Sequence, residues 1–163
     1  MPQNVLVSVL GEGEYLPHLV RAILEKEVIP ARNLFLSSKN EVACQAAEGY
    51  DVRLCEDDLS AVIKSEIVLV TASKREMPTQ LAMISSSSQK RVVVTVCDSD
   101  KVDLAYVSDR IVAATELIAA VLHRDENGKL YATYEISQKA RLFLHQPCRD
   151  LVNAMCDRMN EMG

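Results

Sequence analysis

Apolar and polar residues alternate along the first two thirds of the chain in segments of two kinds. Short apolar runs of strand length lie at residues 5–10, 33–37, 52–55, 67–70, 92–96 and 110–114. Between them, apolar residues recur at the three- and four-residue spacing of amphipathic helices. The uninterrupted, β-branched run at 67–70 is typical of a central parallel strand that is covered on both faces. The pattern predicts an α/β fold with a doubly wound, mostly parallel sheet.

Helix boundaries in this part of the chain follow from local signals. Ser38 and Glu41 match the capping box S-x-x-E, which predicts that Ser38 caps a helix. Gly49 is its expected C-terminal stop. The other helices are predicted from 16 to about 26 with Pro17 in the first turn, after Asp57 or Asp58, from Met77 to 84, and at 102–107.

Beyond residue 115 the pattern changes. Asn127 and Gly128 separate two apolar runs, at 117–124 and 129–135, and Asn-Gly between apolar runs predicts a β-hairpin. The first of these runs also fits a helix. We therefore divide the chain into a doubly wound domain at 1–115 and a hairpin with a helical extension at 116–163.

The helical extension carries one apolar stripe that is rich in methionine. Pro147 breaks or kinks it and predicts two helices, because proline cannot donate the helical hydrogen bond. The stripe either packs back on the domain or forms a surface for a second copy or another protein, a use for which methionine is well suited. Its members are Ile136, Ala140, Phe143, Cys148, Leu151, Met155, Met159 and Met162.

Composition narrows the classes of partner. A chain of 163 residues, 48% hydrophobic, is long enough for one domain with a full core. Its net charge of -5 and its scattered Lys and Arg argue against nucleic acid or an anionic membrane surface as partner. No apolar run approaches the roughly 20 residues of a membrane span, and we expect a cytoplasmic protein. Five cysteines without a C-x-x-C pair predict reduced thiols and no metal site.

The candidate chemistry begins at Gly11-Glu12-Gly13, where a predicted strand ends and a helix begins. A G-x-G turn in this context is where the pyrophosphate of a dinucleotide rests on a helix N-terminus, since the free N–H groups and the helix dipole favour an anion. Ser38 and Lys39 follow the second strand, where a hydroxyl and a cation suit the 2′-phosphate of NADP. Ser38 as a simple helix cap, with Lys39 as a solvated charge, is the alternative.

Residues 4–114 resemble a known family. The resemblance rests on this turn, the connector at 28–33, the Ser37-Ser38-Lys39 segment and the run at 66–70 that leads to Met77-Pro78. The family is that of the N-terminal domain of pyrroline-5-carboxylate reductases and the related F420-dependent NADP oxidoreductases. The resemblance implies a Rossmann-like sheet and an NADP-binding, oxidoreductase-like domain. The cofactor-binding residues that it implies are Gly11, Glu12, Gly13, Glu14, Tyr15, Ser37, Ser38, Lys39, Thr71, Ala72 and Ser73.

Three departures from the family's pattern support a second hypothesis. Leu16 stands where the fingerprint has a small residue, and Glu12 and Glu14 bring negative charge to the pyrophosphate position, at a cost on the order of a kcal/mol. The family's helical dimerisation domain, which holds the substrate near the nicotinamide, has no counterpart after residue 115. No general acid or base can be assigned. The alternative is a non-catalytic interaction module that has lost nucleotide binding, and a third interpretation is a fragment of a longer chain.

Overall fold

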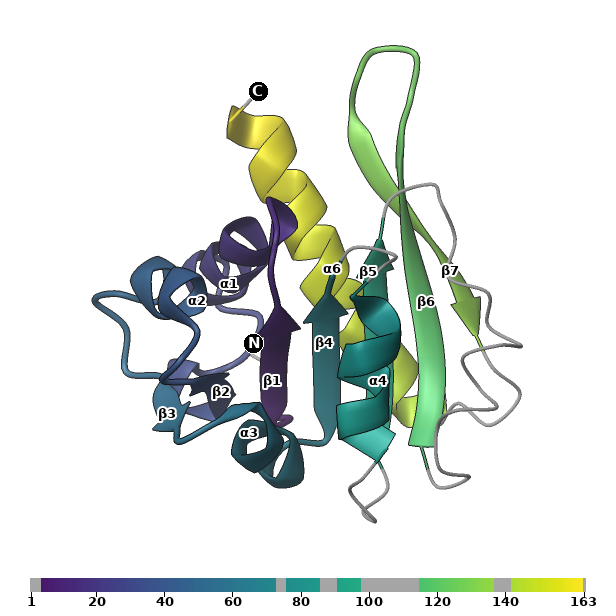
Figure 1. Cartoon of the computed structure of the whole chain (residues 1–163). Helices are drawn as coiled ribbons and strands as arrows, with labels where there is room; N and C mark the ends of the chain where they lie inside the picture. Colours follow the sequence, from purple (N-terminus) through teal and green to yellow (C-terminus); the bar gives the residue numbers. More distant parts are fainter. Residues whose placement is uncertain (1–3, 73–75, 86–90, 98–114, 137–141, 163) are drawn as a thin grey trace.

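The computed structural model describes residues 4–72, 76–85, 91–97, 115–136 and 142–162. Their strands form one sheet in the order β3-β2-β1-β4-β5-β6-β7, parallel from β3 to β6, with β7 antiparallel to β6 (Figure 1). The predicted doubly wound, mostly parallel sheet with a C-terminal hairpin is therefore confirmed. The strands are β1 Val7–Gly11, β2 Leu34–Ser37, β3 Arg53–Cys55, β4 Ile67–Thr71, β5 Arg91–Cys97, β6 Thr115–Arg124 and β7 Leu130–Ile136.

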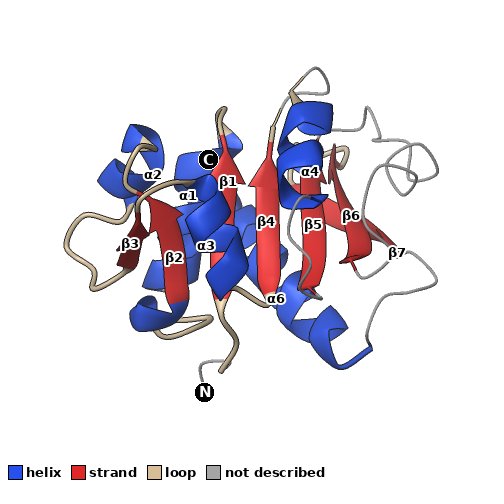
Figure 2. Cartoon of the chain, turned by 60° about the horizontal axis from the view of Figure 1, so that its bottom comes forward, coloured by secondary structure: helices blue, strands red, loops and turns tan. Residues whose placement is uncertain are grey.

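Helices cover both faces of the sheet (Figure 2). They are α1 Tyr15–Glu25, α2 Glu41–Ala46, α3 Asp58–Lys64, α4 Met77–Ser85 and α6 Leu142–Met162, with a 3₁₀ turn at Ala31–Asn33. Side chains of α1, α2 and α6 form one core with alternate residues of the sheet. The residues between them point to the other face, where Val62 of α3 and Met77 and Leu81 of α4 cover them. This alternation is the period of two that a pleated sheet imposes.

The cap of α2 differs from the prediction. Asn40, not Ser38, precedes the helix, and its Oδ1 accepts a hydrogen bond from the Ala43 N–H at 3.2 Å. Ser38 directly follows β2 and still continues its pairing with β3, because its N–H donates to the Cys55 carbonyl at 2.8 Å. The helix begins only at Glu41. The capping-box prediction was wrong. Of the two candidate caps of α3, Asp57 and Asp58, the structure shows Asp57, whose Oδ1 accepts from the Ser60 N–H at 2.8 Å.

The predicted hairpin forms around Asn127 and Gly128, and its first run is a strand rather than a helix. The register pairs Cys97, the last residue of β5, with Val121 of β6. Residues 122–124 of β6 therefore continue past the end of β5, by about 10 Å at the rise of a strand. We call residues 122–130, with the turn, the hairpin arm. It projects beyond the carboxyl edge of the parallel strands.

The C-terminal segment is one helix, so the predicted break at Pro147 was wrong. Proline removes one backbone hydrogen bond. The residues that follow it compensate, because Cys148, Leu151 and Met155 are fully buried in the core that α6 shares with α1 and the sheet. Burial of this size outweighs one lost bond. This part of the methionine-rich stripe packs on the chain itself, whereas Ile136 is 41% exposed.

Some predictions fall outside the described residues, namely the helix at 102–107, the strand at 110–114 and Ala140. The division between residues 115 and 116 stays a prediction, although β6 and β7 belong to the same sheet as β1 to β5. Within the described part of the chain, no helix combines the length and the apolar character needed to cross a bilayer.

Candidate functional site

The predicted site lies where β2, β1 and β4 end side by side. The order of the strands reverses at β1, since the chain moves outward to β2 on one side and returns to β4 on the other. In doubly wound sheets, ligands bind in the crevice outside the carboxyl ends of the strands at such a switch point. The topology thus brings together three of the predicted segments, those that begin at Gly11, Ser37 and Thr71.

Gly11 is required by the backbone itself. Its φ is +108°, and a Cβ there would lie 1.7 Å from the Thr71 carbonyl oxygen. The adjacent Glu12 N–H donates to that same oxygen at 2.8 Å. The turn therefore presses directly against the end of β4, which only a residue without a side chain permits.

The space beside Gly13 is open, and α1 begins two residues later. Gly13 has a φ of +101°, and nothing lies within 4 Å of the position that its Cβ would take. Glu14 is the N-cap residue of α1, and no side chain caps the helix. The positive end of the helix dipole at this N-terminus favours an anion. Leu16 is fully buried in the core, and Tyr15 packs partly against it.

The segment after β2 presents a hydroxyl and a cation to solvent. Ser37 is buried, and its Oγ accepts a hydrogen bond from the Lys39 N–H at 3.2 Å. Ser38 and Lys39 are exposed. The hydrogen bonds from Ser60 and, to a lesser extent, the charge of Lys39 lower the pKa of Asp57. The Lys39 ammonium thus lies within electrostatic reach of one carboxylate.

The segment after β4 contributes less. Thr71 is buried, and its hydroxyl donates to the Leu10 carbonyl oxygen at 3.3 Å, so its side chain holds β1 to β4. Ala72 is partly buried beside it, and Ser73 lies outside the described residues. Thr71 therefore supports the glycine turn, and its part in binding a nucleotide stays a prediction.

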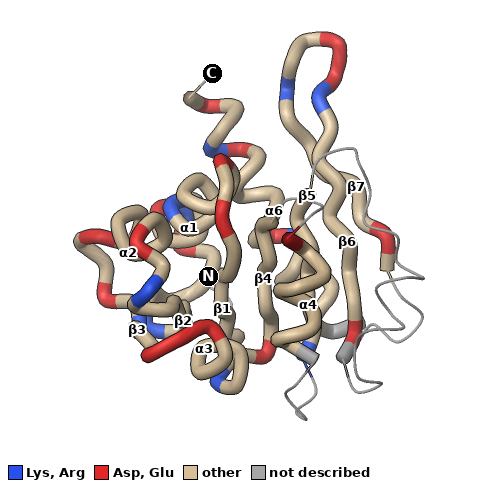
Figure 3. Tube along the Cα trace, in the orientation of Figure 1, with Lys and Arg blue, Asp and Glu red and all other residues tan. Residues whose placement is uncertain are grey.

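Negative charge is concentrated at the turn. Glu12 and Glu14 are both exposed, and Figure 3 shows acidic positions along the segment after β1. His18 lies one turn into α1, and its Nδ1 is 2.8 Å from Nη1 of Arg158 on α6. Burial and the Arg158 charge lower the pKa of His18, while Glu14 opposes them. In its neutral form His18 accepts the hydrogen bond from Arg158.

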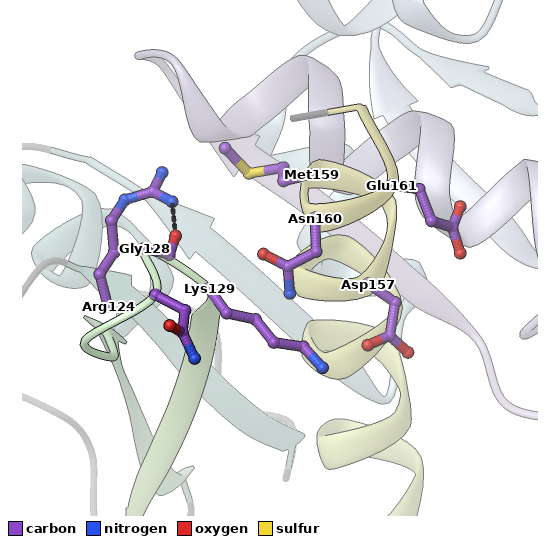
Figure 4. A pocket seen from close by; sticks show the side chains of 8 residues that line it. Arg124, Gly128, Lys129, Asp157, Met159, Asn160 and Glu161 are labelled. Atoms are coloured by element: carbon purple, nitrogen blue, oxygen red, sulfur yellow. Dashed lines mark hydrogen bonds between the residues drawn. The ribbon is translucent and has the colours of Figure 1, made fainter.

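A second cavity, absent from the sequence prediction, lies between the hairpin arm and the end of α6 (Figure 4). It has a volume of about 550 Å³. Asn160 closes its inner side, because Oδ1 accepts from the Leu130 N–H at 2.8 Å and Nδ2 donates to the Leu130 carbonyl at 2.9 Å. Arg124 and Lys129 on the arm are balanced by Asp157 and Glu161 on α6, so the lining has no net charge.

All five cysteines of the chain are free thiols, as predicted, and Cys44 alone is partly exposed. The Cys44 thiol donates to the Ser37 carbonyl at 3.4 Å. Burial raises the pKa of Cys148 to about 12 and that of Cys156 to about 11, which keeps both thiols protonated. Among residues that the structure describes, no three His, Cys, Asp or Glu side chains group as metal ligands would.

Comparison with known proteins finds similarity in fold alone. No family model matches the sequence, and no match to it is found among the curated proteins. Pyrroline carboxylate reductase from Plasmodium falciparum, solved with NADP bound, superposes with a TM-score of 0.73 at 10% identity over 95% of this chain. Pyrroline-5-carboxylate reductase from Coxiella burnetii gives a TM-score of 0.72 at 11% identity over 94%. The predicted resemblance to this family is thus confirmed for the fold.

The lengths of the similar proteins differ. This chain spans only 56% of the Plasmodium reductase and 57% of the Coxiella reductase. It spans 81% of a hypothetical protein from Sinorhizobium meliloti, with a TM-score of 0.55 at 12% identity. The described fold therefore corresponds to little more than half of a reductase of this kind.

Proposed function

We propose that this chain is an oxidoreductase-like, NADP-binding domain whose site is the carboxyl edge of β1, β2 and β4. The observation that carries the proposal is the Gly11–Gly13 turn, which presses on β4, has open space beside Gly13 and leads directly into the N-terminus of α1. A helix N-terminus after a glycine turn fits a pyrophosphate, because the backbone N–H groups and the helix dipole there attract an anion. NADP bound to the Plasmodium reductase, whose fold is similar, supports the same assignment.

The segment after β2 supports NADP over NAD. A ribose hydroxyl is usually bound by an acidic residue at the end of the second strand, and Ser37, Ser38 and Lys39 occupy that place in this chain. The Ser38 hydroxyl can donate a hydrogen bond to a 2′-phosphate, and the Lys39 ammonium can form an ion pair with it. The nicotinamide of such a ligand supplies hydride chemistry. Catalysis further requires a substrate held against it.

Replacement of Lys39 tests the proposal. In Lys39→Met, we expect the affinity for NADPH to fall about tenfold, which corresponds to a loss of roughly 1.4 kcal/mol in binding free energy. The affinity for NADH should change little. Isothermal titration calorimetry measures both. Lys64→Met is the matched control, because Lys64 lies in the last turn of α3, away from the end of β2. Equal losses for NADPH and NADH in Lys39→Met would contradict the assignment of the 2′-phosphate.

A second candidate function is a non-catalytic interaction module. The exposed carboxylates of Glu12 and Glu14 favour it, because they oppose an anionic ligand at the turn. A homodimer or a protein partner at the C-terminal helix belongs to this hypothesis, with Met162, 62% exposed, as its clearest apolar contact. Sedimentation of the chain at micromolar concentration tests it, and a strict monomer that binds NADPH tightly would exclude it.

A further inference from the structure

Asn40 stands between β2 and α2 with both halves of its carboxamide in use. Oδ1 accepts from the Ala43 N–H at 3.2 Å, and Nδ2 donates to the Gly11 carbonyl at 3.1 Å. Its main chain is held as well, because the N–H donates to the Ser37 carbonyl and the carbonyl accepts from the Cys44 N–H, each at 3.0 Å. The side chain that caps α2 thus also reaches across to the end of β1.

The group that Asn40 contacts is the peptide between Gly11 and Glu12. The carbonyl of this peptide accepts from Asn40, and its N–H donates to the Thr71 carbonyl at 2.8 Å. One peptide plane is therefore fixed from β4 on one side and from the start of α2 on the other. Its orientation directs the chain into Gly13 and the first turn of α1.

Few side chains can perform both tasks. Asparagine carries a carbonyl acceptor and an NH₂ donor on the same short group. Aspartate keeps the acceptor for Ala43 but has no donor for the Gly11 carbonyl, and serine caps a helix equally well but is shorter. The geometry thus uses a property that the capping role alone does not require.

We propose that Asn40 is a positioning residue that ties the Gly11–Gly13 turn to the Ser37–Lys39 segment, so that both are held in fixed register. This role rests on the proposed function. Under that function, Asn40 links the segment that would bind the pyrophosphate to the segment that would bind the 2′-phosphate of the same dinucleotide. A ligand that contacts both segments then meets a site that is already arranged, which lowers the entropic cost of binding.

Hydrogen exchange of the protein without nucleotide tests the link directly. In Asn40→Ser, which keeps a capping side chain, we expect the Glu12 amide to exchange at least tenfold faster relative to the buried Val94 amide of β5. The ratio removes any change in global stability. Asp57→Ala is the control, because it deletes the cap of α3 without touching the turn. An unchanged ratio in Asn40→Ser overturns the proposal.

Calorimetry with NADPH and NADH completes the test. The dissociation constant of Asn40→Ser for NADPH is expected to rise about tenfold, and its preference for NADPH over NADH to shrink. If the original chain binds neither nucleotide, the proposed function fails, while the exchange ratio still decides whether Asn40 holds the turn. If the original chain binds NADPH and Asn40→Ser binds it equally well, the link to the site is overturned.

Discussion

The turn after β1 and the β6–β7–α6 unit both reach the carboxyl edge of the sheet, and contacts between distant segments hold both, yet only the contact at the turn is marked by a recognisable sequence motif. The turn is determined by Gly11, whose missing side chain lets the backbone meet Thr71. The hairpin arm and α6 are held by contacts between segments far apart in the sequence, such as the pair of hydrogen bonds from Asn160 to Leu130. A short glycine motif thus marks the first contact in the sequence, whereas no such motif marks the contact between Asn160 and Leu130.

Replacement of Gly11 by alanine has the largest expected effect. The added Cβ collides with the Thr71 carbonyl, and the positive φ disfavours any side chain, so we expect a loss of at least about 3 kcal/mol of unfolding free energy. Urea denaturation measures it. Gly13→Ala is the control, because its φ is also positive but its surroundings are open, and about 1 kcal/mol is expected. Equal losses of unfolding free energy in Gly11→Ala and Gly13→Ala would show that the close approach of Gly11 to β4 is not what makes Gly11 necessary.

Asn160→Ala probes the second region. It removes two hydrogen bonds to the Leu130 backbone, and we expect a loss of about 2 kcal/mol. The loss is measured by urea denaturation, and faster amide exchange at Leu130 locates it in the hairpin. Gln146→Ala on the exposed side of α6 is the control, with a change within about 0.5 kcal/mol. A stable variant with unchanged exchange would show that the arm does not depend on α6.

Charge at the turn gives a smaller effect on binding. We expect the double replacement of Glu12 and Glu14 by glutamine to raise the affinity for NADPH about tenfold, because removing each screened like charge is worth up to roughly 1 kcal/mol. Calorimetry at low ionic strength measures the affinity. An unchanged affinity would contradict a repulsion between these carboxylates and the ligand. Glu27→Gln, beyond the opposite end of α1, serves as control and should leave the affinity unchanged.

The smallest expected effect is the pH dependence of the contact between α1 and α6. The pKa of His18 is lowered in the folded state, so the unfolded chain binds the proton first as the pH falls. Stability is therefore full above the ordinary His pKa of 6.5 and decreases below it. Urea midpoints at pH 7.5 and 5.5 measure the change. The shift of the urea midpoint between the two pH values should be smaller in His18→Gln than in the original chain. An equal shift in both would show that other groups cause it.

The parts that the sequence predicts are those that local chemistry decides. Val92 to Val96 alternate between the two cores as a covered strand should, and Gly11 occupies the turn that a strand followed by a helix requires. The errors come from distant partners. The sequence pattern predicts Ser38 as a helix cap because its pairing with Cys55 of β3 is not visible in the local sequence. It predicts a break at Pro147 because the burial of Leu151, which stabilises the continuous helix, depends on α1 and the sheet.

The candidate site shows the same division. The turn could be identified from its glycine motif, and the Ser37–Lys39 segment from its place directly after the second predicted strand. Asn40 could not, because its contact with Gly11 joins residues 29 positions apart. The Asn160 contact with Leu130 joins residues 30 positions apart and was missed for the same reason. Residue types alone give no signal for such contacts.

The central claim is that the carboxyl edge of β1, β2 and β4 binds NADP. Calorimetric titration of the chain with NADPH tests it most directly, with NADH as the matched ligand without the 2′-phosphate. We predict saturable binding with one NADPH per chain, tighter than that of NADH. The absence of saturable binding at millimolar NADPH would contradict the account and favour the interaction module.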